Sequence, residues 1–230
     1  IGGDADGDGQ PDPWQLVQTR EAFHQLATGP APKRVCGVAQ VLKGLQHDRA
    51  GELGAPFATP QLEQVPSLAE MTAAALNVLD ADADGFCLMI EGGAVDLASH
   101  SKRLDRMIEE EIAFNHAVAT VLDWVQQHSN WEETLVIVTG DHETGYLTAP
   151  SNGQSPDAAA PLVNHGAGQV PGAQWNSKQH TNSLIPVFAK GAGIGLLEAA
   201  ADQVDPVRGR YIDNTEIATV MRSVIVGSEE

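Results

Sequence analysis

The chain has 230 residues, of which 31 are Asp or Glu and 13 are Lys or Arg, so its formal net charge is −18 at pH 7. This length suits one domain with a sizeable core, and 42% hydrophobic residues are too many for a disordered acidic tail. The charge argues against nucleic acid or an anionic membrane surface as a partner, because both would repel it. No apolar run reaches the ~18 residues that a membrane-spanning helix needs.

The acidic surface has two interpretations that composition alone does not separate. An excess of Asp over Lys keeps a salt-adapted protein hydrated, but an ordinary acidic secreted enzyme has a similar composition. The salt-adapted interpretation is slightly favoured, because only five residues are lysines.

The predicted elements alternate between helix and strand. Residues 1–13 (IGGDADGDGQPDP) are rich in Gly, Asp and Pro and predict a loop, and residues 14–230 form the domain proper. Helices are predicted at 14–28, 67–79, 103–128 and 213–226. A short strand is predicted within 34–41, and further strands at 86–90, 134–139 and 184–189. This alternation predicts an α/β fold with a mainly parallel sheet flanked by helices. The Gly/Pro/Asn-rich excursion at 143–183 is longer than an ordinary connection, so we expect function there.

Two features strengthen individual helices. Ser67 and Glu70 have the spacing of a capping box, which marks the start of the second helix. The helix at 103–128 carries an apolar stripe on one face, formed by Met107, Ile108, Ile112, Val118, Val121, Leu122 and Val125.

Acidic and histidine side chains follow the predicted strands. Glu91 follows the strand at 86–90, and Asp96 and His100 lie four residues apart, on one face of a helical turn. Asp141 and His142 follow the strand at 134–139, and His180 precedes the last strand. Carboxylates and neutral imidazoles are ligands for zinc, and chemistry in such sheets gathers at the carboxyl ends of strands. Each residue alone has an ordinary structural explanation, but the combination predicts a metal site.

Three motifs resemble the C-terminal half of bacterial alkaline phosphatases, over most of the chain from about residue 15 to 226. They are IEGGAVDLASH (90–100), VIVTGDHETGYL (136–147) and QHTNSLIPVFAKG (179–191). The resemblance implies the fold of that family, present as a partial C-terminal domain, and hydrolysis of phosphate monoesters. It also implies a homodimer, or association with the missing N-terminal half, and a periplasmic or secreted location.

The resemblance further implies roles for individual residues. Asp96, His100 and His180 would form the complete protein ligand set of a first zinc ion. Asp141 and His142 would be two ligands of a second zinc ion, and Glu91 one ligand of a neighbouring magnesium ion.

The nucleophile-bearing part of such an enzyme is expected to be absent. In the family, a serine or threonine in an Asp-Ser-Ala-Gly motif lies well upstream of the metal ligands, and no such segment occurs here. Four hydroxyls lie near the predicted ligands in sequence, but none has the expected surroundings: Ser99, Thr139, Thr144 and Ser183. We therefore expect the isolated chain to be inactive. The alternative is a folded, non-catalytic metal-binding fragment, and a sulfatase or phosphodiesterase relative is less favoured.

The N-terminal loop carries a second metal hypothesis. Asp4, Asp6, Asp8 and Asp12 place oxygen ligands at alternate positions, as in a calcium loop. Position twelve is Gln15 rather than the Glu of an EF-hand, so a flexible acidic turn is an equal alternative.

Overall fold

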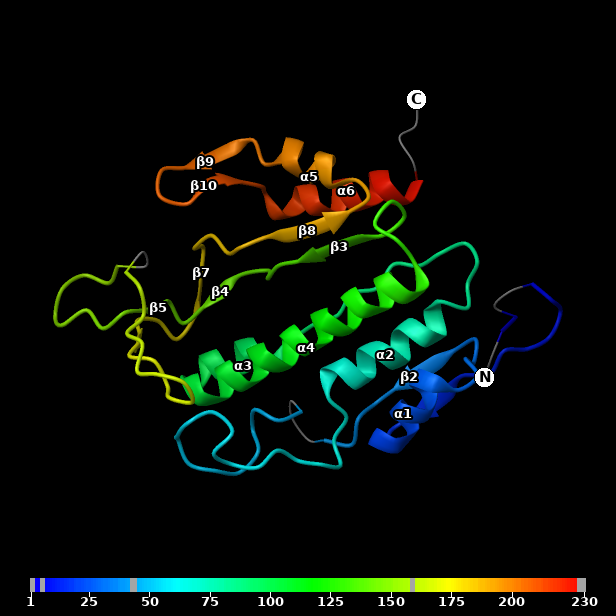
Figure 1. Cartoon of the computed structure of the whole chain (residues 1–230), viewed down its shortest axis with the longest axis horizontal. Coiled ribbons are helices and arrows are strands. Elements are labelled where there is room, and N and C mark those ends of the chain that lie inside the picture. The colour runs from blue at the N-terminus through cyan, green and yellow to red at the C-terminus, as the bar shows by residue number, and fades with distance from the viewer. Residues whose placement is uncertain (1–2, 5–6, 42–44, 158–159, 227–230) are drawn as a thin grey trace. The chain divides into compact units, whose positions relative to one another are not determined.

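The computed structural model describes residues 3–4, 7–41, 45–157 and 160–226 (Figure 1). The chain divides into two compact units, and the boundary falls within its longest helix. The first unit runs up to Trp124 and includes Ala167–Val170, and the second comprises Val125–Gly166 and the chain from Pro171 onward.

Each unit has its own set of helices and strands. The first contains β1 (Gln15–Val17), α1 (Arg20–Thr28), β2 (Val35–Gly37), α2 (Leu68–Leu79), α3 (Ala94–His100) and most of α4 (Leu104–His128). The second contains β3 (Leu135–Val138), β4 (Glu143–Thr144), β5 (Leu147–Thr148), β6 (Gln174–Trp175), β7 (His180–Thr181), β8 (Phe188–Gly191), α5 (Ile194–Ala200), β9 (Gln203–Asp205), β10 (Gly209–Tyr211) and α6 (Asn214–Val226).

A βαβ motif opens the first unit. β1 and β2 pair in parallel, and α1 connects them, since parallel strands need a crossover. α1 begins after Thr19, whose hydroxyl accepts a hydrogen bond from the Ala22 amide. The prediction of a helix from residue 14 is therefore wrong at its start: residues 15–17 form a strand because their partner β2, distant in sequence, supplies the hydrogen bonds.

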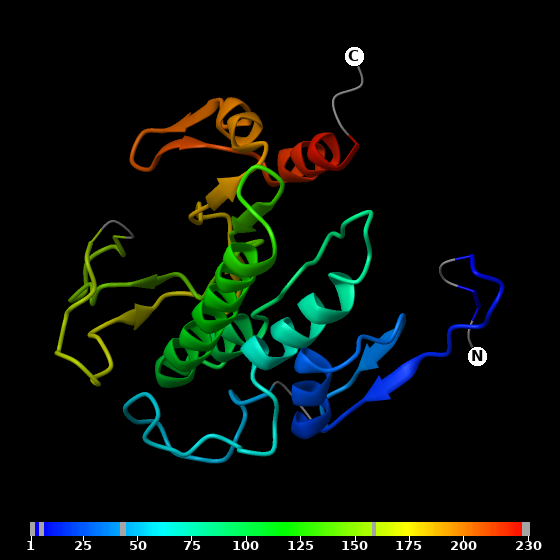
Figure 2. The same cartoon turned by 45° about the vertical axis from the view of Figure 1, so that its right-hand side comes forward.

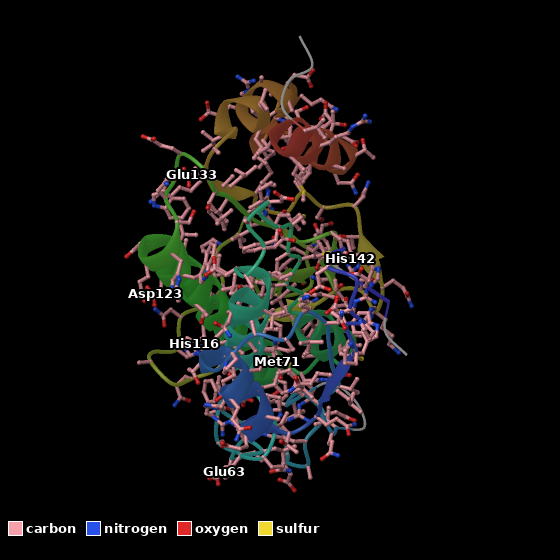
Figure 3. All side chains as sticks on the ribbon, turned by 90° about the vertical axis from the view of Figure 1, so that its right-hand side faces the viewer. Glu63, Met71, His116, Asp123, Glu133 and His142 are labelled. Carbon is pink, nitrogen blue, oxygen red and sulfur yellow. The ribbon has the colours of Figure 1, made fainter. Side chains whose placement is uncertain are left out.

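The core of the first unit lies where α1 packs against α2 (Figures 1 and 2). Four buried side chains form it, namely Val17, Phe23, Leu26 and Ala74. Met71 of α2, labelled in Figure 3, packs against this group. The predicted capping box at Ser67 and Glu70 is confirmed, with both of its hydrogen bonds present. Each large apolar side chain buried here contributes about 2 kcal/mol.

The second unit is built on a long antiparallel ribbon. The chain runs out through β3, β4 and β5 and returns through β6, β7 and β8, so that β5 pairs with β6, β4 with β7 and β3 with β8. The excursion predicted at 143–183 is thus the outer part of this ribbon. β9 and β10 form a separate hairpin between α5 and α6 (Figure 2).

The predicted mainly parallel sheet is not confirmed among the described strand pairs. β1–β2 is parallel, whereas the other four pairs are antiparallel. The physical reason is the connection between the strands. When the chain reverses its direction and runs back beside the strand it has just formed, the two strands pair antiparallel. The last predicted strand is also displaced, to β8 at Phe188–Gly191.

Residues 86–90 were predicted as a buried strand, and this prediction is wrong for the described structure. They belong to no helix or strand there, Cys87 is exposed and Met89 is 86% exposed. An apolar run favours a strand, but a strand also needs a neighbour for its backbone hydrogen bonds.

The first half of α4 buries charge as well as apolar side chains. Arg106 and Glu109 are each 1% exposed, whereas Ile112 of the predicted apolar stripe is 37% exposed. The stripe is therefore confirmed only in part, at Val125 for example, which is fully buried. Within the described ranges, no helix is both long enough and apolar enough to span a membrane.

Candidate metal centre

In the first unit, two glycines lead into the helix that carries Asp96 and His100. A side chain on Gly92 would meet the Phe114 ring at 2.8 Å, and one on Gly93 would meet Glu91 Oε1 at 2.8 Å. The small residues therefore let the chain turn tightly between Glu91 and the start of α3 at Ala94.

Helix α3 places Asp96 and His100 on one face, as predicted. The Asp96 Oδ1 and His100 Nε2 atoms lie 3.4 Å apart, and both side chains are one-third exposed (33%). An oxygen and an imidazole nitrogen at this separation, both open to solvent, suit a shared divalent cation or a carboxylate that orients a ligating imidazole.

In the second unit, the antiparallel ribbon brings together two histidines that are 38 residues apart in sequence. His142, labelled in Figure 3, lies between β3 and β4, and His180 begins β7. Their rings stack with centroids 3.5 Å apart and an interplanar angle of 18°. A nitrogen of each ring lies within 4.8 Å of one on the other. An imidazole binds a metal in the plane of its ring, so two stacked rings suit two neighbouring ions, which in two-metal sites lie about 3.5–4 Å apart.

Two further side chains lie beside His142. Asp141 Oδ2 lies 3.4 Å from His142 Nε2, and the Asp141 side chain is 87% exposed. The Thr144 hydroxyl lies 3.3 Å from His142 Nδ1, so it can fix the orientation of the ring. Sequence reasoning considered Thr144 only as a nucleophile and missed this role, although its position two residues after a candidate ligand on a strand was a usable signal.

The four candidate hydroxyls are engaged in local contacts. Ser99 is buried and donates to the Val95 carbonyl at 2.8 Å, within α3. Thr139 donates to the Pro186 carbonyl at 3.1 Å, Thr144 lies against His142, and the Ser183 hydroxyl lies 3.1 Å from that of Thr181. Three of these contacts are with a carbonyl or another hydroxyl, and the contact of Thr144 is with His142, which is itself a candidate metal ligand.

The N-terminal acidic loop has a defined hydrogen-bond pattern. The Asp4 carboxylate accepts from the amides of Gly7 and Gly9 at 2.7 and 2.8 Å. The Lys33 ammonium lies 3.2 Å from both Asp8 and the largely buried Asp12. Asp6, the remaining predicted ligand, lies outside the described residues. A lysine cation therefore occupies the position between Asp8 and Asp12.

Comparison with known proteins assigns the family. Residues 8–171 match the sequence model of the family described as alkaline phosphatase. The chain is 31% identical over 152 residues to the alkaline phosphatase of Escherichia fergusonii, a match that covers 62% of this chain and 30% of that protein. It is 34% identical over 141 residues to the streptomycin-6-phosphate phosphatase of Streptomyces griseus, covering 55% of this chain and 30% of that protein.

Solved structures show a similar fold. The cold-active alkaline phosphatase of Shewanella sp. matches with a TM-score of 0.63 and 20% identity, over 92% of this chain and 59% of that one. A variant of the alkaline phosphatase from the Antarctic bacterium TAB5, solved with Mg bound, matches with a TM-score of 0.51 and 25% identity, over 78% of this chain and 46% of that one. The chain spans about a third of its curated relatives and about half of these structures. It belongs to the alkaline phosphatase family.

Proposed function

We propose that this chain carries the metal-binding part of a phosphomonoester hydrolase. Membership of the alkaline phosphatase family supports the reaction class, and a relative that by its name acts on streptomycin 6-phosphate supports a phosphate monoester as substrate. The observation that carries the proposal is the stacked pair of His142 and His180, with Asp141 and Thr144 beside it.

The ligand assignment follows the family motifs. Asp96, His100 and His180 hold a first zinc ion, Asp141 and His142 hold a second, and Glu91 holds magnesium. Imidazole and carboxylate donors fit zinc, and the carboxylate of Glu91 fits magnesium. The Mg-bound TAB5 variant supports a divalent ion in this family. When bound, such ions stabilise the negative charge on the oxygens of a transferring phosphoryl group.

We further propose that the 230-residue chain does not turn over substrate by itself. The support is the local engagement of its four candidate hydroxyls, such as Ser99 with the Val95 carbonyl. The second candidate function is therefore a folded, non-catalytic metal-binding fragment. Activity would then require a nucleophile from outside this chain, supplied by association with the N-terminal half of such an enzyme. A homodimer is the alternative assembly that the resemblance implies, but a second copy of the same chain would not supply the nucleophile. We also propose a periplasmic or secreted location, which rests on the family resemblance.

Metal analysis tests the proposal. We expect the purified chain to retain one or more zinc ions after dialysis. Elemental mass spectrometry measures this number of zinc ions per chain. His180→Ala should lower the zinc content by about one ion per chain, because His180 is assigned to the first zinc ion only. The free energy of unfolding should change by less than about 1 kcal/mol, because this residue is exposed. The matched control is His116→Ala, on the exposed face of α4 (Figure 3), which should leave zinc content unchanged.

Two results would count against it. A wild-type chain without zinc would overturn the metal assignment. Hydrolysis of p-nitrophenyl phosphate at about 10 s⁻¹, an ordinary enzymatic rate, would contradict the absence of a nucleophile.

Calcium binding by the N-terminal loop is a separate proposal, in which the cation displaces Lys33 from Asp8 and Asp12. Adding calcium should then raise Tm by mass action, since it binds only the folded loop. Asp12→Asn should abolish the rise, whereas Asp157→Asn, a matched change of an exposed residue in the second unit, should preserve it. A calcium-independent Tm would leave the loop as a Lys33-bridged acidic turn.

A further inference from the structure

The ladder that brings His142 and His180 together is very short. β4 and β7 contain two residues each, with Glu143 opposite Thr181 and Thr144 opposite His180. A two-stranded ladder of this length is marginal by itself in water. The pairs β3–β8 and β5–β6 continue the ribbon on either side, so a further connection between β4 and β7 would fix the local geometry of the two rings rather than the pairing itself.

Glu143 provides that connection through both of its carboxylate oxygens. Oε2 accepts a hydrogen bond from the Thr181 hydroxyl at 2.5 Å, which crosses from β4 to the residue after His180. Oε1 accepts from the Tyr146 amide at 2.6 Å, which closes the turn after β4. Hydrogen bonds to an ionised carboxylate are shorter and about twice as strong as neutral ones.

The turn that Glu143 closes has an unfavourable backbone. Tyr146 has a φ of 46°, in the left-handed region that a residue with a bulky side chain rarely adopts. Gly145 has a φ of 87°, and a side chain there would meet the Trp175 ring at 2.5 Å. The bond from the Tyr146 amide to Glu143 offsets part of this cost, so the carboxylate stabilises the turn and the strand pairing together.

We propose that Glu143 is a positioning residue, which holds the His180 ring against the His142 ring by tying Thr181 to the turn after β4. It is not assigned as a metal ligand, because both oxygens are already engaged. The consequence for metal binding rests on the proposed function, but the ring contact itself does not depend on any metal.

Ring contact in the metal-free protein is the primary test. Nuclear Overhauser effects between the ring protons of His142 and His180 report the stack directly. We expect them in the wild type, and we expect their loss in Glu143→Ala and in Thr181→Val, which keeps the β-branched shape but removes the hydroxyl. Thr181→Ser restores the donor and should restore the signals.

Zinc affinity, measured by isothermal titration, is the second readout. Loss of a partner that orients a ligating histidine typically costs 10–100-fold in affinity. We expect about a tenfold loss for Glu143→Ala and for Thr181→Val, and a loss of less than about threefold for Thr181→Ser.

The matched control is Glu216→Ala in the same unit. Glu216 Oε2 accepts from the Asp213 amide at 2.9 Å, so it too is a carboxylate that closes a turn, at the start of α6. It should lower Tm but leave the ring signals and zinc affinity unchanged.

The outcomes separate the two proposals. Wild-type protein that shows the ring signals without binding zinc would refute the metal assignment and leave the role of Glu143 standing. Folded Glu143→Ala and Thr181→Val proteins that keep both the ring signals and the wild-type affinity would overturn the positioning role.

Discussion

Two polar clusters in this chain differ in burial and in how their bonds are made. In the first unit, Glu109 is buried and its carboxylate pairs with Arg49 at 2.6 Å and with Arg106 at 3.0 Å. In the second unit, the half-buried His142 and the exposed His180 stack beside the exposed carboxylate of Asp141. A buried carboxylate with several internal partners indicates a structural role, whereas partly exposed imidazoles gathered beside a carboxylate indicate a site for a ligand.

The buried cluster also fixes irregular chain. Arg49 donates to the carbonyls of Gln46, Thr59 and Pro60, and Glu109 Oε1 accepts from the Phe57 amide at 2.7 Å. These bonds hold residues 46–60, which contain no helix or strand, against α4. In this region, buried ion pairs and hydrogen bonds therefore fix the chain, as strand pairing or apolar packing does elsewhere.

Removal of Glu109 should produce the largest effect on stability. Glu109→Ala leaves two buried guanidinium groups without their carboxylate, so we expect a loss of about 3–5 kcal/mol in the free energy of unfolding, measured with urea. Glu111→Ala, an exposed carboxylate on the same helix, should cost less than about 0.5 kcal/mol. Equal effects of the two changes would show that the cluster contributes no more than surface charge.

The raised pKa of Glu110 should make the free energy of unfolding depend on pH. Burial, with the neighbouring charge of Glu109, raises its pKa to about 7, and the opposing charges of Arg49 and Arg106 only reduce this shift. The folded protein therefore binds this proton more tightly than the unfolded chain, whose Glu has a pKa near 4.5. The contribution of the protonated group is complete below pH ~4.5 and is lost as the pH rises to about 7, by about 3 kcal/mol.

Glu110→Gln should remove this decline, which urea unfolding at several pH values would measure. The loss of stability at acid pH comes from a different group, Glu70. Its pKa is lowered to about 2, because hydrogen bonds from Arg20, Ser67 and His24 outweigh the effect of burial. Its contribution is present above pH ~4.5 and is lost as the pH falls toward 2. A wild-type curve that does not fall between pH 5 and about 7 relative to Glu110→Gln would contradict the assignment.

The smallest expected effect is that of salt on the stability that the buried cluster contributes. Raising NaCl from about 0.1 M to about 1 M shortens the Debye length from about 10 Å to about 3 Å and screens the exposed excess of negative charge. We expect the wild-type Tm to rise, as the salt-adapted interpretation requires, while the stability difference between wild type and Glu109→Ala changes by less than about 0.5 kcal/mol. A Tm that does not rise would remove that interpretation, and a salt-sensitive difference would show that the cluster is accessible to ions.

Local signals in the sequence were sufficient for most of the helices. The capping box at Ser67 and Glu70 predicted the start of α2, and the four-residue spacing of Asp96 and His100 predicted their common face on α3. These features depend on residues three or four positions apart, which a helix brings together without help from the rest of the chain.

The strands were predicted less well, because pairing depends on residues that are distant in sequence. The run at 86–90 has the composition of a strand, but it pairs with no strand among the described residues. β1 was predicted to be part of a helix, because the strand that pairs with it, β2, lies 20 residues away in sequence. The buried charges of α4 were missed for the same reason: Arg49, which neutralises Glu109, comes from an irregular segment far from the helix in sequence.

The sequence by itself determined the family, the candidate ligands and the positions of the longer helices, since motifs and short-range spacing carry that information. Only the tertiary structure decided that β3–β5 and β6–β8 form one antiparallel ribbon, and that its register stacks His142 on His180 with Glu143 bound to Thr181. The physical reason is that register depends on hydrogen bonds between strands nearly 40 residues apart, which no local pattern encodes.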